Sequence, residues 1–104
     1  MTNWYSANLL FRANVDDDSG AQPLCEESLR VLIADSDEDA RTRAEQIGRA
    51  AQHSYLNDAG KEVQWVFVSV LELQDLCESA LLDGMEVFSR LYREKEEEPE
   101  KLSP

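Results

Sequence analysis

The stretch from Lys61 to Leu73 limits the possible folds most, because both of its alternating faces are apolar. Side chains of a strand point alternately to opposite sides of a sheet, so a strand with one solvated side alternates between apolar and polar residues. This stretch instead has apolar residues on one face at Val63, Trp65, Phe67 and Leu71, and on the other at Val66, Val68 and Val70. The pattern predicts a central strand that needs cover on both faces.

Two more strands are predicted near the start of the chain. Apolar residues occupy every second position from Tyr5 to Val15, and a run rich in Leu, Val and Ile extends from Cys25 to Ala34. The polar stretch between them suits a surface loop, so we expect the two strands to pair antiparallel. We expect the second strand to turn one set of side chains toward the core, namely Leu29, Val31 and Ile33.

One helix is predicted after these strands. Ser36 precedes Asp39 by three residues, a weaker form of the capping box that starts many helices. Apolar residues then recur at helical spacing in a stripe that ends near Gln52, formed by Ala40, Ala44, Ile47 and Ala51. With Gly48, these short side chains would let the helix lie close to a sheet.

A hairpin and a last strand are predicted after the helix. The hairpin joins a short strand at His53 to Leu56 with the long strand from Lys61. Asp83-Gly84 predicts a tight turn into a final strand at Met85 to Arg93. The predicted fold is α+β, an antiparallel sheet of four to five strands with one long helix across one face, in the order β-β-α-β-β-β.

The chain length and the composition of its end predict one domain. A chain of 104 residues is of ordinary single-domain size. We expect residues 1–93 to form one α+β domain and residues 94–104, rich in Glu, to form an acidic disordered tail.

The net charge of −12, from 22 acidic and 10 basic residues, excludes several classes of partner. A field of this sign repels nucleic acid and anionic membranes and attracts basic proteins. The start of the sequence lacks the features of an export signal, and no apolar run reaches the length of a membrane span. We expect a cytoplasmic protein whose two cysteines, Cys25 and Cys77, are reduced and buried.

Few residues suggest a catalytic or metal centre. The four glycines are scattered singly, so no glycine-rich phosphate loop is present. A zinc site would need Cys25, His53 and Cys77 to converge from distant positions. We therefore expect no metal and no cofactor, and we regard enzymatic activity as uncertain and less favoured than binding.

Glu27 is the most interesting carboxylate, since it shares the alternation of Leu29 and Val31. Pointing inward, it would pair with Arg12 or Arg30, or have the raised pKa that suits a general acid or base. Alternatively, the regular strand starts only at Ser28 and leaves Glu27 in solvent. A small-molecule or catalytic cleft would combine four residues, Glu27, His53, Tyr55 and Trp65.

One helix cannot cover both faces of the predicted sheet. We expect the second face to carry Trp4, Leu10, Leu32, Val66, Val68, Val70 and Phe88. Either this face lies under loops and the Gln74 to Leu82 segment, or it is a contact surface for another chain.

Several short blocks in a fixed order resemble a known family. They are Trp4 to Phe11, Cys25 to Ser28, the Ala34 to Ala44 strand-to-helix junction, Ser54 to Asn57 with Gly60, Trp65 to Val68, and Asp83-Gly84 with Glu86 to Arg90. The set resembles the small bacterial family known as domain of unknown function 4288, over roughly residues 4 to 92. The resemblance implies a compact bacterial domain and assigns no activity, cofactor or catalytic residue.

The sequence therefore favours a non-enzymatic protein interaction module, with a homodimer as its simplest form and a basic protein as another possible partner. A small-molecule-binding or enzymatic domain around Glu27, Tyr55 and Trp65 is the alternative. Nucleic acid and membranes are not expected partners.

Overall fold

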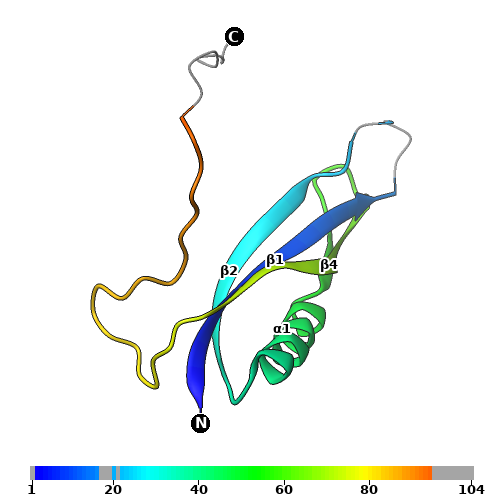
Figure 1. Ribbon diagram of the computed structural model, residues 1–104. Coiled ribbons are helices and arrows are strands. Elements are labelled where there is room, and N and C mark those ends of the chain that lie inside the picture. The colour runs from blue at the N-terminus through cyan, green and yellow to red at the C-terminus, as the bar shows by residue number, and fades with distance from the viewer. Residues whose placement is uncertain (1, 17–19, 21, 95–104) are drawn as a thin grey trace.

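The computed structural model describes residues 2–16, 20 and 22–94, and it contains one antiparallel sheet and one helix in those residues (Figure 1). The elements follow in the order β1 (Asn3–Val15), β2 (Cys25–Ala34), α1 (Asp37–Ala50), β3 (His53–Leu56) and β4 (Glu62–Asp75). The strands lie in the order β2-β1-β4-β3. The α+β class, the antiparallel sheet and the single helix are thus as predicted.

The strands β1 and β4 form the middle of the sheet. β1 pairs with β2 on one side and with β4 on the other, and β4 also pairs with the short β3. The stretch with two apolar faces is therefore an internal strand, as its pattern predicted. Its pairing with β1 shifts register twice, between Asn8 and Leu9 and between Leu10 and Phe11.

The helix α1 starts where the sequence predicted and lies close to the sheet. Ser36 is its N-cap, and the Ser36 hydroxyl accepts a hydrogen bond from the Asp39 N–H at 3.1 Å. Ala40 and Ala44 are fully buried, and at Gly48 the helix backbone meets the ring of Phe67. The core is the layer between α1 and the alternate β1 side chains Tyr5, Ala7, Leu9 and Phe11.

The face of β2 that meets the core differs from the prediction. Leu32 is 3% exposed and Ala34 is buried, whereas the row expected inside, Leu29, Val31 and Ile33, is exposed. Both faces of β2 carry apolar residues, so its own pattern does not decide between them. Pairing decides: Leu32 stands opposite Tyr5, a core residue of β1.

The predicted fifth strand is absent from the described residues. β4 continues to Asp75, and residues 76–94, which we call the arm, contain turns but no strand or helix. The arm starts beside β1, where the Leu76 N–H donates to the Trp4 carbonyl at 2.9 Å and the Trp4 N–H donates to the Glu78 carbonyl at 2.7 Å. Figure 1 shows the arm, coloured yellow to orange, then running apart from the sheet and from α1. The predicted acidic tail, except Glu94, lies outside the described residues.

Within the part of the chain that the structure describes, no helix has the length and apolar character needed to cross a membrane.

Candidate functional site

The sheet face opposite α1 carries an exposed row of apolar side chains, and we call this face the open face. Register places the side chains that point away from α1 in cross-strand pairs: Trp4 with Ile33, Ser6 with Val31, Asn8 with Leu29, and Leu10 with Glu27. The β2 row of this face is solvent-exposed, at 53% for Leu29, 43% for Val31 and 47% for Ile33. Three exposed apolar side chains in one unbroken row form a contiguous patch rather than isolated surface residues.

The centre of the open face contains a polar pair of a buried residue, Asn8, and an exposed one, Glu27. Asn8 is 6% exposed, and its Nδ2 donates a hydrogen bond to Glu27 Oε1 at 2.8 Å. Asn8 Oδ1 is buried and accepts no hydrogen bond from the described residues. A buried acceptor without a donor is costly, so this amide oxygen lowers the stability of the fold.

The seven side chains predicted for the second face are divided by the structure. Trp4, Leu10 and Val66 lie on the open face by register and are half-buried. Leu32 lies on the opposite side, in the core, and Val70 packs against that core opposite Leu9. Val68 lies at the second register shift and is partly exposed, and Phe88 belongs to the arm.

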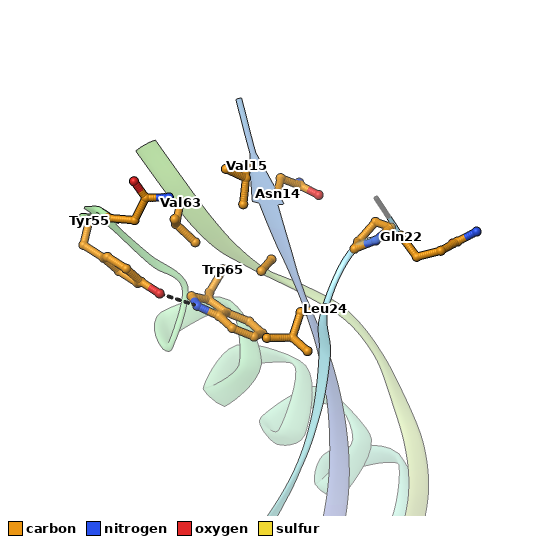
Figure 2. Close-up of a pocket in the computed structure, with 10 residues that line it drawn as sticks. Asn14, Val15, Gln22, Leu24, Tyr55, Val63 and Trp65 are labelled. Atoms are coloured by element: carbon orange, nitrogen blue, oxygen red, sulfur yellow. Dashed lines mark hydrogen bonds between the residues drawn. The ribbon is translucent and has the colours of Figure 1, made fainter. Parts of the chain in front are cut away.

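A pocket of about 490 Å³ lies at the end of the sheet beyond the C-terminus of α1 (Figure 2). Its apolar lining includes Leu24, Val63 and Trp65, and its polar lining includes Asn14 and Gln22. The Tyr55 hydroxyl reaches the Trp65 indole, whose Nε1 donates to it at 3.5 Å. The pocket therefore offers an apolar wall with a few polar groups, the usual composition of a small-molecule site.

Of the four residues predicted for a cleft, Tyr55 and Trp65 line this pocket, and His53 lies next to them in the sheet without lining it. His53 pairs with Trp65 across the β3–β4 ladder, and the His53 and Tyr55 rings stack with centroids 6.1 Å apart. The His53 Nδ1 also lies 3.1 Å from the Ala51 carbonyl at the end of α1. Glu27 lies on the open face instead, where its partner is Asn8 rather than Arg12 or Arg30, and the Arg30 Nε donates to the Ser28 hydroxyl.

The cysteines are free, as predicted, but they are exposed rather than buried. Cys25 lies at the start of the edge strand β2, and Cys77 lies in the arm, so neither has a packed layer above it. Among the described residues, no three His, Cys, Asp or Glu side chains gather as metal ligands would.

Tyr5 is the ionisable group with the clearest perturbation. It is buried under the start of α1, and its hydroxyl donates to Asp37 Oδ1 at 3.1 Å. Burial, followed by this hydrogen bond to Asp37, raises the pKa of Tyr5 to about 12. Tyr5 therefore serves as a neutral structural donor.

Sequence reasoning missed Asn8 and the exposed β2 row. Asn8 alternates with the core residues of β1, which indicates the opposite face but gives no sign of burial. The neighbours that bury it come from β2 and β4 and depend on the register. The β2 row was recognised as apolar but was placed on the wrong side.

Comparison with known proteins identifies a family and no function. Neither a curated protein nor a solved structure matches the chain significantly. A family model described as "Domain of unknown function (DUF4288)" matches residues 4–89. That span contains α1, all four strands and most of the arm. The resemblance inferred from the short blocks is thereby confirmed, and the chain belongs to the family Domain of unknown function (DUF4288).

Proposed function

We propose that this domain is a non-enzymatic protein interaction module that acts as a homodimer through the open face of its sheet. The observation that carries the proposal is the row of Leu29, Val31 and Ile33, which is apolar, contiguous and roughly half-exposed on a sheet face without a helix over it. Removing such a row from water contributes about 25 cal/mol per Å² of apolar surface, and the entropy lost on association offsets part of this gain.

A second copy of the chain fits this surface in polarity. By register the open face carries Glu27, Glu62 and Glu72 beside Arg12, so the apolar contact acts against a local excess of negative charge. A symmetric pair also uses the same patch twice. The same acidic character would speed association with a basic protein, the other partner class that we propose.

The mass of the full chain in solution tests the homodimer. Light scattering coupled to size exclusion should give twice the chain mass of 11.8 kDa, with dissociation on dilution. The double substitution Val31→Gln and Ile33→Gln should shift the chain to monomer. Leu24→Gln, at an exposed leucine that precedes β2 and lines the pocket with Val63 and Trp65, is the matched control. A monomer of unchanged wild-type protein at all concentrations would contradict the proposal.

The aromatic pocket supports a second candidate function, binding of a small molecule. Its volume of about 490 Å³ and the Tyr55 and Trp65 rings carry this alternative, which the sequence also favoured. A thermal-shift screen of metabolites should then find a ligand that raises the melting temperature of the wild type and not of a Trp65→Leu variant. Absence of any stabilising metabolite counts against this function and leaves the homodimer untouched.

A further inference from the structure

We propose that the homodimer forms by exchange of arms: the arm of one copy crosses the open face of the other, and the exchange is reciprocal. This inference rests on the proposed function, because it names what covers the open face in the dimer. The occupant is a defined segment, residues 76–94 of a second copy. The recognition is apolar.

The arm has the composition of a buried segment and the exposure of an unbound one. Five of its large apolar side chains are exposed, namely Leu81, Leu82, Val87, Leu91 and Tyr92, whereas Leu76, Met85 and Phe88 are partly buried. Leu91 is 98% exposed and Tyr92 is 84% exposed, so these two touch almost nothing in their own chain. The same molecule thus contains an apolar face without cover and an apolar segment without a surface to lie on. Contact between the arm of one copy and the open face of another removes both apolar surfaces from water.

The root of the arm directs it away from its own sheet. Cys77 has a φ of 60°, a left-handed backbone conformation that residues other than Gly and Asn rarely adopt. The Asp75 carboxylate holds this turn by accepting from the Cys77 N–H at 2.7 Å. A strained connection of this kind favours exchange of the segment that follows it, because the segment can leave while its root stays paired with Trp4.

The length of the arm is sufficient for this role. β2 has 10 residues and therefore spans about 33 Å at the usual rise of a strand. Residues 79–94 in extended form reach about 50 Å, which is enough to leave one subunit and cross the face of the next. The family model extends to residue 89, so most of the arm is part of the family's common domain.

Two full-length variants with complementary defects test the exchange. The face variant carries Val31→Gln and Ile33→Gln, and the arm variant carries Leu82→Gln and Leu91→Gln; all four positions are exposed, so folding should be preserved. Sedimentation of each variant alone should show a dimer dissociation constant at least tenfold above the wild type, while Leu24→Gln, in the pocket lining, behaves like the wild type. In an equimolar mixture, the intact arm of one variant can lie on the intact face of the other, so a heterodimer should form more tightly than either homodimer.

Each outcome decides between distinct models. Recovery of dimer in the mixture supports the exchange. An arm variant that dimerises like the wild type, beside a face variant that does not, overturns the exchange and retains the homodimer with face packed on face. A wild-type chain that stays monomeric overturns both proposals. This holds also if the arm of that monomer lies on its own sheet.

Discussion

At the scale of single residues, the Tyr5 phenol links the stability of the fold to pH. Its pKa is raised to about 12 in the folded chain, first by burial and then by the hydrogen bond to Asp37. A group with a raised folded pKa stabilises fully below its usual pKa of about 10 and loses that contribution as the pH rises through the folded value. The melting temperature should therefore fall between pH 10 and 12. The fall should be shallower in Tyr5→Phe, measured by circular dichroism with the exposed Tyr92→Phe as control; equal slopes would contradict the assignment.

Asn8 and Glu27 make a second prediction at this scale. Asn8→Asp replaces the donor at 2.8 Å from Glu27 Oε1 with a second carboxylate. Repulsion and the lost hydrogen bond should lower the free energy of unfolding by about 2 kcal/mol at neutral pH. Adding Glu27→Gln restores a donor and should recover most of the loss. Urea unfolding of both variants measures these free energies. An Asn8→Asp chain as stable as the wild type would show that the Asn8–Glu27 pair does not contribute to stability.

At the scale of elements, the close contact between α1 and β4 depends on Gly48, which has no side chain. A Cβ at residue 48 would lie 2.6 Å from Cε1 and 2.8 Å from Cγ of Phe67. Gly48→Ala gains about 1 kcal/mol in helix propensity, but forcing the ring aside costs about 1–3 kcal/mol. We expect a net loss of stability, whereas Thr42→Ala on the exposed side of α1 should be neutral or stabilising. Thermal unfolding compares the two, and a stabilised Gly48→Ala chain would indicate that Phe67 moves freely.

The elements themselves were predictable where their signals are local. Ser36 and the alanine stripe defined α1, and the alternation from Tyr5 to Val15 defined β1, because each signal lies within a few residues. The inward side of β2 was not predictable, since it depends on which residue of β1 stands opposite Leu32. The arm was mistaken for a strand because Val87, Phe88 and Leu91 have strand-like composition, and composition does not reveal whether a neighbouring strand is available.

At the scale of the whole molecule, net charge opposes self-association. Two chains of charge −12 repel each other at low ionic strength, and salt screens that repulsion. The Debye length is about 14 Å in 50 mM NaCl and about 4 Å in 500 mM NaCl. The dimer dissociation constant should therefore fall severalfold between these two salt concentrations. Sedimentation equilibrium measures it. A dimer that weakens with salt would point to ion pairs rather than an apolar contact.

The candidate sites show the same division between local and long-range information. His53, Tyr55 and Trp65 were predicted as one group and do gather, because a tight hairpin fixes their register. Glu27 was assigned to that group and lies on the other side of the sheet, because its place depends on pairing between strands separated by a long loop. Asn8 had no signal in the sequence, since its burial is created by neighbours from two other strands.

The strand β2 occupies an outer position in the sheet, and among the described residues no strand pairs with its free side. A free edge of 10 residues can recruit strands from other molecules without limit, which is how fibrils grow. Glu26, Glu27 and Arg30 interrupt that edge with charge and so oppose indefinite stacking. Removing these charges should therefore make pairing of this edge with other copies, and with it precipitation, more favourable.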